Sequence, residues 1–343
     1  MTQLRVAQWA SGNIGIRAMK AVIEHPDLEL VGVLVYDPAK VGVDAGALCG
    51  LHETGVLATA DADEIVALGA DCVLHMPRSM NFDDIARLLS AGSNVVTTCG
   101  GFHHPPSMDA ATRELIENAC AVGDTSVYAT GSSPGFITEA IPLALTSIQR
   151  RLDCLTIDEF ANLSPRDSPD LLFNIMGFGQ PPAAYDENRL AHLKAGFGPS
   201  LRQLADAIGI EVDAVNARGE VAVAARPIEI AAGVVEAGTV AAMRTTVSVE
   251  SGGREALRFR ATWYCGTDLD TDWELQDTGW RINVEGDTPL DVTLRFPVSL
   301  EQMAATTPGY TAHRAVNAVN VVCASASGIQ TTAELPHIIA NLR

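Results

Sequence analysis

The spacing of apolar residues divides the chain into two parts with different periods. From residue 1 to about 150, short apolar runs alternate with stretches in which apolar residues recur every three or four positions. The short runs predict buried strands, and the longer stretches predict amphipathic helices. Strands are predicted at residues 4–10, 28–36, 56–59, 72–76, 94–98 and 125–130, and helices at residues 14–25, 61–68, 82–91 and 109–122. This alternation indicates an α/β domain of the Rossmann type, with a doubly wound parallel sheet.

Residues 239–297 alternate with a period of two, which is typical of strands with one buried face. The alternation and a strand predicted at residues 152–162 indicate an α+β domain with an open, mainly antiparallel sheet. Its polar face carries Tyr264 and several arginines, and we expect that face to be available for a homodimer contact. The predicted domains are residues 1–150 and residues 151–308, and a C-terminal helix within residues 309–343 completes the first.

The junction between the first strand and the first helix has the pattern of a dinucleotide-binding turn. The free N–H groups at a helix start bind phosphate, and glycine lets the backbone approach it closely. Asp37 follows the second strand, about 20 residues after the last glycine, where a carboxylate accepts hydrogen bonds from a ribose diol. The residues predicted to bind NAD or NADP here are Ser11, Gly12, Asn13, Ile14, Gly15 and Asp37.

The fingerprint is incomplete, because the usual pattern G-x-G-x-x-G would have its first glycine where Ala10 stands. The two remaining glycines also occur in tight turns that bind no ligand. Their position between a strand and a helix, followed by an acidic residue, favours the nucleotide.

The composition of the chain argues against several kinds of binding partner. The formal charge of −19, from 42 acidic and 23 basic residues, argues against a nucleic-acid surface. No apolar run is long enough to span a membrane, and the first residues lack the pattern of a signal peptide, so a cytoplasmic protein is expected. The seven scattered cysteines form no CxxC pair, and no histidine spacing typical of zinc sites occurs, so we expect no metal.

Ligands of doubly wound sheets bind at the carboxyl ends of the strands, so the loops there are candidate site segments. The fifth and sixth predicted strands are followed by glycine-rich loops, and the last helix carries a polar stripe of His313, Asn317 and Asn320 that faces either solvent or a partner. Further residues predicted to contact the cofactor are Pro77, Arg78, Thr98, Cys99, Gly100 and Asn317.

Four residues are candidates for proton transfer, and five for contact with a small-molecule substrate. Histidine suits proton transfer because its unperturbed pKa lies near neutrality. The proton-transfer candidates are His103, His104, Glu139 and Glu159, and the substrate candidates are Gly101, Phe136, Asn162, Phe173 and Met176. The apolar residues among the latter have the alternative of belonging to the hydrophobic core.

With these motifs in view, the chain resembles the dihydrodipicolinate reductase superfamily, in the branch of diaminopentanoate dehydrogenase and the native amine dehydrogenases. The resemblance rests on GNIG near the start, VVTTCGG after the fifth strand, TGSSPGF after the sixth, and HRAVNAV near the end. It implies a Rossmann domain that binds NAD or NADP, and a second domain whose open sheet shapes the substrate pocket and often the dimer.

Two departures from the family pattern bear on the activity. The HHxxK-type motif of dihydrodipicolinate reductases is missing from the second domain, which argues against that reaction. The resemblance places a catalytic glutamate of amine dehydrogenases at the position of Gly101, so the acid that activates ammonia is missing there.

The function expected from the resemblance is NAD(P)-dependent oxidoreduction at C=O or C=N bonds, as in the reductive amination of small ketones or aldehydes. The nicotinamide is expected against residues 98–101 and near Asn317. One alternative is a carbonyl or imine reductase that uses no free ammonia. Another, of a different class, is a nucleotide-binding protein without catalytic turnover, which Gly101 favours.

Overall fold

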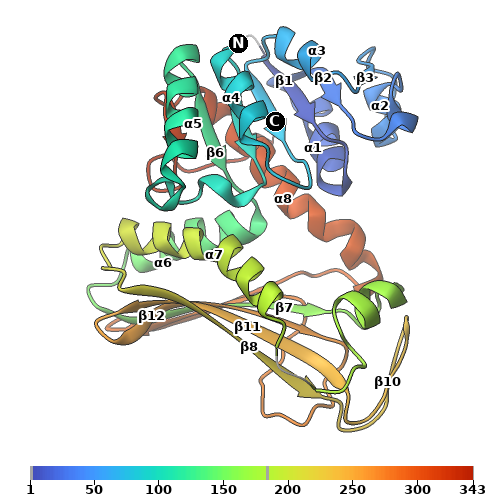
Figure 1. Ribbon diagram of the computed structural model, residues 1–343, viewed down its shortest axis with the longest axis vertical. Helices are drawn as coiled ribbons and strands as arrows, with labels where there is room; N and C mark the ends of the chain where they lie inside the picture. The colour runs from blue at the N-terminus through green and yellow to red at the C-terminus, as the bar shows by residue number, and fades with distance from the viewer. Residues whose placement is uncertain (1–2, 183–184, 343) are drawn as a thin grey trace. The chain divides into compact units, whose positions relative to one another are not determined.

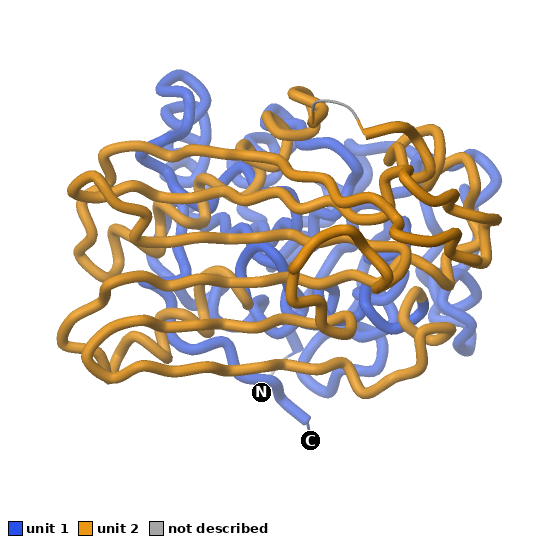
Figure 2. The backbone as a smooth tube through the Cα atoms, turned by 90° about the horizontal axis from the view of Figure 1, so that it is seen from below, with its two compact units in different colours: residues 1–136, 305–343 blue, residues 137–304 orange. Residues whose placement is uncertain are grey.

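The computed structural model describes residues 3–182 and 185–342, and the chain folds into two compact units (Figure 2). The first unit comprises Met1–Phe136 and Ala305–Arg343, and the second comprises Ile137–Ala304. The division falls earlier than the expected boundary at residue 150, because α6 (Ile141–Thr146) packs against α7 (Glu187–Ala207) of the second unit. The second unit is therefore an insertion between two segments of the first.

The first unit is a seven-stranded parallel sheet with helices on both faces (Figure 1). The strand order is β15-β6-β5-β4-β1-β2-β3, so that β1 and β4 are neighbours at the point where the winding changes direction. The strands are β1 (Leu4–Trp9), β2 (Leu28–Leu34), β3 (Ala58–Thr59), β4 (Cys72–His75), β5 (Asn94–Thr97), β6 (Ser126–Ala129) and β15 (Gly328–Gln330). This arrangement confirms the predicted fold class for the first domain.

Each face of this sheet has its own hydrophobic core. The helices of one face are α1 (Asn13–Ile23) and α8 (Leu300–Cys323), which bury Met19, Val316 and Val319 against the strands. The other face is covered by α3 (Ala62–Ala67), α4 (Phe82–Ser90) and α5 (Ala110–Gly123). All six strands and four helices predicted in residues 1–130 are present, with ends displaced by a few residues.

Two elements of the first unit were not predicted. Helix α2 (Ala45–Cys49) is short and begins where the carboxylate of Asp44 accepts a hydrogen bond from Gly46 N. Strand β15 pairs in parallel with β6 and extends the sheet after α8. The C-terminal helix also differs from the prediction: it begins at Leu300 and ends at Cys323, so the tail after it is a strand and loops.

The second unit contains a six-stranded sheet in the order β14-β13-β7-β12-β11-β8, antiparallel except for the pair β7 and β12. Its strands are β7 (Leu152–Asn162), β8 (Ala214–Val223), β11 (Val240–Ser251), β12 (Arg254–Tyr264), β13 (Gly279–Gly286) and β14 (Leu290–Arg295); β9 (Ile228–Ile230) and β10 (Gly233–Val235) pair separately. The tube representation in Figure 2 shows the long strands lying side by side. This confirms the open, mainly antiparallel sheet predicted for the second domain.

Helix α7 (Glu187–Ala207) covers one face of this sheet. The ring of Phe197 stacks on that of Phe259, with 3.9 Å between the ring centroids. Gly252 and Gly253 both have positive φ, of +59° and +76°, in the hairpin that joins β11 to β12. This hairpin fixes which residues of the two strands face α7.

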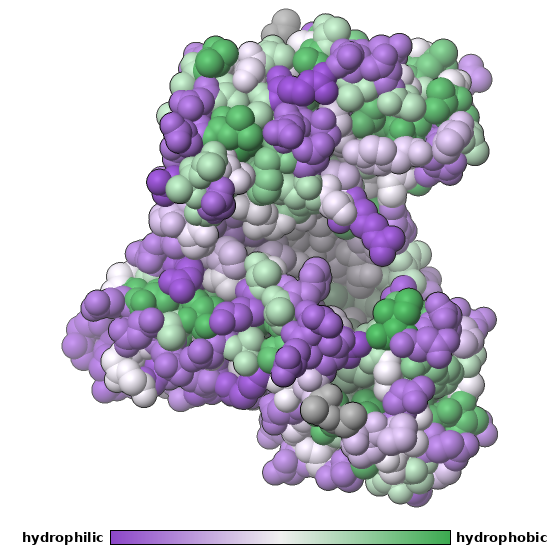
Figure 3. Space-filling model, viewed as in Figure 1, coloured by the Kyte–Doolittle hydropathy of each residue, from purple (hydrophilic) through white to green (hydrophobic). Residues whose placement is uncertain are grey.

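The described residues include no helix that is long and apolar enough to cross a membrane. Hydrophilic residues cover most of the visible face of both units, and apolar residues are scattered among them (Figure 3). All seven cysteines are free thiols.

Candidate functional site

The turn after β1 has the backbone geometry of a glycine-rich phosphate turn, although it begins with an alanine. Ala10 has φ of +78°, in the left-handed region where the missing first glycine of the fingerprint would be unstrained. An L-residue there costs roughly 1–2 kcal/mol relative to its preferred conformations. The side-chain amide of Gln8 donates to the carbonyl of Ala10 over 2.9 Å and helps to hold the turn.

Gly15 allows α1 to approach this turn closely. A Cβ atom at residue 15 would lie 2.1 Å from the carbonyl oxygen of Ala10, so only glycine fits. Gly12 is the N-cap of α1, and no atom lies within 4 Å of where its Cβ would be. The first turn of α1 contains no acidic residue. The predicted segment 11–15 therefore forms an open, positively polarised helix start that fits a pyrophosphate.

Asp37 follows β2, the strand beside β1. Its carboxylate accepts a hydrogen bond from Ala39 N over 3.0 Å and is otherwise exposed. Lys40 ends the short helical turn that Asp37 caps, and it donates from Nζ to the carbonyl oxygen of Ser11 over 3.0 Å. The ring of Tyr36 is held by a hydrogen bond of 2.8 Å from Trp9 Nε1 to its hydroxyl. These contacts connect the end of β2 to the phosphate turn and fit an adenosine ribose.

The loops after β4 and β5 are joined by hydrogen bonds at the edge of the first sheet where the carboxyl ends of its parallel strands lie, here called the carboxyl edge. Thr98 N donates to His75 O over 3.2 Å, and Cys99 N donates to Thr97 Oγ1 over 3.1 Å. The thiol of Cys99 contacts the carbonyl oxygen of Pro77 at 3.4 Å. The structure therefore brings Pro77, Thr98 and Cys99 together, whereas Arg78 is exposed.

Gly100 and Gly101 begin a short helical turn, Gly100–Phe102, and neither has a positive φ. A Cβ atom at residue 101 would lie 3.1 Å from Met80 Cε and 3.2 Å from Phe82 Cζ. A side chain at residue 101 therefore requires small shifts of the Met80 and Phe82 side chains, and it requires no change of the backbone conformation.

The next two residues, His103 and His104, are both buried. His104 Nδ1 lies 2.8 Å from Ser107 Oγ, within the same loop. Both histidines thus lie on the segment that follows β5, in the unit that carries the phosphate turn.

Helix α8 packs against the loop after β6. Thr311 Oγ1 lies 2.8 Å from Ser132 Oγ and accepts from Ser132 N over 3.3 Å. A Cβ atom at Gly131 would lie 3.3 Å from Thr311 Cγ2, so glycine permits this approach. Asn317 lies on the same helix and is half-buried, whereas His313 and Asn320 of the predicted stripe are exposed.

Five buried side-chain atoms at or beside this carboxyl edge have no hydrogen-bond partner among the described residues. They come from β1, from the ends of β4 and β6, from the loop after β6 and from α8: Gln8 Oε1, His75 Nε2, Thr130 Oγ1, Ser133 Oγ and Arg314 Nε. Buried polar atoms are rarely left without a partner in folded proteins. Their gathering at this edge, together with the close approach at Gly15, fits a dinucleotide and a polar substrate.

The candidate residues of the second unit lie in four separate environments. The buried carboxylate of Glu139 accepts a hydrogen bond from Ser200 Oγ over 2.7 Å. The half-buried Glu159 accepts one from Trp280 Nε1 over 2.9 Å. Asn162 ends β7, and its side chain accepts from Ser164 N. Phe173 and Met176 pack on an apolar cluster centred on Leu172 and Phe178, as their core alternative predicts. Met176 also borders a cavity of about 250 Å³.

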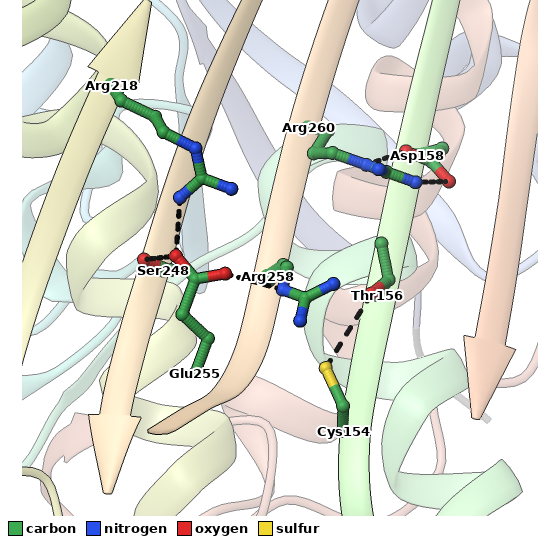
Figure 4. Close-up of polar contacts among 8 residues, drawn as sticks. All are labelled: Cys154, Thr156, Asp158, Arg218, Ser248, Glu255, Arg258 and Arg260. Atoms are coloured by element: carbon green, nitrogen blue, oxygen red, sulfur yellow. Dashed lines mark hydrogen bonds and ion pairs between the residues drawn. The ribbon is translucent and has the colours of Figure 1, made fainter. Parts of the chain in front are cut away.

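The face of the second sheet turned away from α7 carries a network of charged residues (Figure 4). Arg260 binds Asp158 through two hydrogen bonds of 2.5 and 2.8 Å, and Arg258 donates to Glu255 over 2.7 Å. Arg218 also binds Glu255. Burial of the guanidinium alone lowers the pKa of Arg260, but the bonds to Asp158 outweigh it and raise that pKa above its ordinary value.

Comparisons with known proteins match nearly the whole chain. Residues 136–342 match the family of the 2,4-diaminopentanoate dehydrogenase C-terminal domain, and residues 9–124 match the family of the dihydrodipicolinate reductase N-terminus. An amine dehydrogenase of Streptomyces virginiae is 27% identical over 350 residues, which cover 96% of this chain and 95% of that protein. A 4-hydroxy-tetrahydrodipicolinate reductase of Synechocystis is 23% identical and covers 57% of this chain and 73% of that protein.

Among solved structures, the amine dehydrogenase from Mycobacterium smegmatis superposes with a TM-score of 0.74 at 18% identity. The likeness covers 99% of this chain and 98% of that chain. At this level of identity the superposition shows a shared fold. Within the described residues, no group of three or more His, Cys, Asp or Glu side chains could hold a metal ion.

Sequence reasoning missed the polar residues that end the strands of the first unit. Gln8 and His75 stand inside apolar runs, so their runs predict strands and say nothing of a site. One signal in the sequence could have identified these two residues as site candidates. A polar side chain near the end of a buried strand lies close to the carboxyl edge, where ligands bind. His75 is fully buried, and Nδ1 lies 3.2 Å from Thr97 Oγ1.

Burial lowers the pKa of His75 from 6.5 to about 4, so the imidazole is neutral at neutral pH. The unfolded chain then binds a proton between pH 6.5 and 4 that the folded chain does not, and stability falls as the pH falls through this window, by up to about 3 kcal/mol. We expect His75→Gln to remove this part of the pH dependence of the urea unfolding midpoint. The control variant His52→Gln replaces an exposed histidine and should keep the pH dependence of the unaltered protein. If the midpoint of His75→Gln depends on pH as that of the unaltered protein does, His75 is not the group responsible.

Proposed function

The chain belongs to the family of the 2,4-diaminopentanoate dehydrogenase C-terminal domain, which makes it an NAD(P)-dependent oxidoreductase, and we propose that it reductively aminates small ketones or aldehydes. The observation that carries the proposal is the gathering of unpartnered buried polar atoms at the carboxyl edge beside a phosphate turn. The amine dehydrogenase of Streptomyces virginiae, which is similar over almost its whole length, supports the reaction class.

In this proposal the dinucleotide lies along the carboxyl edge of the first sheet. Asp37 after β2 holds the adenosine ribose, and the start of α1 holds the pyrophosphate. The nicotinamide lies towards β5 and β6, against Thr98, Cys99 and Gly100 and near Asn317. The cofactor supplies the hydride, and the chain supplies orientation and proton transfer.

The reaction needs a group that moves protons at the substrate carbon. Ammonia adds to the carbonyl, the adduct takes up a proton and loses water, and the resulting iminium carbon accepts a hydride, so that one amine, one water and one oxidised cofactor result. His103 and His104 are the candidates on the first unit, because they follow the segment proposed to hold the nicotinamide. Glu139 and Glu159 remain candidates from the second unit, each with a hydrogen-bond donor on its carboxylate.

Gly101→Glu tests this reading of the pocket. The backbone at residue 101 accepts a side chain, and a carboxyl group there should raise the ammonium-dependent oxidation of NAD(P)H with small ketones by about a hundredfold to ten-thousandfold. Gly101→Gln has the same size and transfers no proton, so it should show no gain.

The unaltered protein is assayed with and without ammonium on the same ketones. Oxidation of NAD(P)H that requires ammonium supports the proposal, whereas equal rates without it indicate a carbonyl reductase. Tight cofactor binding with no turnover over a panel of ketones, imines and amines indicates a nucleotide-binding protein. A folded Gly101→Glu protein with no gain counts against an amine-dehydrogenase pocket.

Asp37→Ala should weaken NADH binding by about tenfold or more and NADPH binding by less. The carboxylate accepts hydrogen bonds from the ribose diol and repels a 2′-phosphate, while Lys40 is engaged with Ser11. Titration of cofactor fluorescence measures both affinities. The control variant Glu114→Ala removes an exposed carboxylate on α5, and it should leave both affinities unchanged. Equal losses for the two cofactors would remove Asp37 from this role.

We further propose that the charged face of the second sheet forms a homodimer contact. Arginines and carboxylates alternate across neighbouring strands, so two copies present complementary charges to each other. Thr246, Ser248 and Thr262 of these strands are fully buried, so the larger charged side chains supply the accessible surface of this face.

Light scattering at micromolar concentration should give twice the chain mass of 36.2 kDa. Arg258→Glu reverses one charge of the network and should shift the mass towards a single chain. Arg113→Glu, on the surface of α5 in the first unit, should leave it unchanged. A mass near 36.2 kDa for the unaltered protein would refute the contact.

A further inference from the structure

Arg314 on α8 is a half-buried guanidinium without an anionic partner. Its Nε atom is buried, and the side chain has no hydrogen bond or ion pair within the described residues. The guanidinium carbon lies over the ring of Phe136, 5.9 Å from the ring centroid. Arg258 and Arg260, which are also half-buried, each bind a carboxylate.

The position of Arg314 along the carboxyl edge follows from its neighbours. One helical turn before it, Thr311 is fixed to Ser132 after β6, and Phe136 ends the same loop. In the sheet order, β6 is separated from β1 by β5 and β4, which places the two strands about 14 Å apart. Asp37 lies on the opposite side of β1, after β2. Arg314 is therefore at the end of the edge where the proposed nicotinamide and the substrate meet.

An arginine in this setting is a binding site for an oxyanion. The guanidinium stays charged at all relevant pH values, and its planar fork matches a carboxylate with two parallel hydrogen bonds. Removing a charge from water without a partner is costly, so a half-buried guanidinium gains most from an anion that enters with it. The phosphate turn has its own donors in the first turn of α1, about 14 Å away by the strand spacing.

We propose that Arg314 binds the carboxylate of an oxo-acid substrate or its amino-acid product, with the apolar chain of the substrate against Phe136. This inference rests on the proposed function, since it names the substrate class of the same site. A guanidinium binds oxyanions of either kind present at this site, a carboxylate of the substrate or a phosphate of the cofactor, so the experiment must distinguish the two. A substrate without a carboxylate would leave the guanidinium unpaired and would bind more weakly.

The test compares small oxo acids with their primary amides, which have the same shape and no charge. For the unaltered protein with NAD(P)H, KM should be lower for the oxo acids than for the amides by about tenfold to a hundredfold. Arg314→Met should remove that difference by raising KM for the acids alone. Arg314→Lys, which keeps the charge and loses the fork, should retain part of it. Arg113→Gln, a surface arginine on α5, is the control for loss of charge and should behave as the unaltered protein does.

Binding is measured separately by calorimetry of the oxo acid against the protein saturated with NAD⁺, which needs no turnover. If the proposed amination fails but the acid binds tightly in the unaltered protein and weakly in Arg314→Met, the inference stands without that function. Weakened NADH binding in Arg314→Met, with the preference for acids unchanged, would assign Arg314 to a cofactor phosphate and overturn the inference. Equal affinities for acid and amide in the unaltered protein would also overturn it.

Discussion

The first unit depends on how closely α1 approaches the turn after β1. The carbonyl of Ala10 occupies the space that a side chain at residue 15 would need, so Gly15 sets the distance between helix and strand. The same contact requires the left-handed backbone of Ala10 and the amide of Gln8 that binds its carbonyl. The contact between Gly15 and the carbonyl of Ala10 therefore places the N-terminus of α1 at the carboxyl edge. The other loops of the candidate site lie along the same edge.

Much of the architecture could be predicted because it follows from periodicity. The six apolar runs of the first unit are continuous, as strands buried on both faces must be, and the period of two in β11 to β14 indicates one-sided burial. Strand β15 escaped prediction because three residues carry too little pattern. Strand β8 alternates, but Gly219 interrupts it; a Cβ atom there would lie 2.1 Å from the ring of Tyr185, a contact that only the folded chain reveals.

The candidate site was less accessible to sequence reasoning, for a physical reason. Motif spacing located the phosphate turn and the loops after β5 and β6, since their glycines mark places where the backbone turns sharply. The spacing marked Ala10 as the place of a missing glycine, but it did not show that an alanine adopts the conformation of that glycine. It also gave no sign that His75 would lie buried and neutral at the end of β4. Arg314 belonged to a noted motif, yet its isolation from carboxylates is a property of three-dimensional packing.

The return of the chain to the first unit after Ala304 links ligand affinity to the docking of its C-terminal segment. Helix α8 supplies Thr311, Arg314 and Asn317 to an edge built otherwise from residues before Phe136. A ligand held by both segments binds only the docked state, so it shifts the equilibrium of docking by the free energy of its own binding. Because the second unit lies between these two segments in the chain, a ligand that both segments hold also stabilises the closure of the first unit around the insertion.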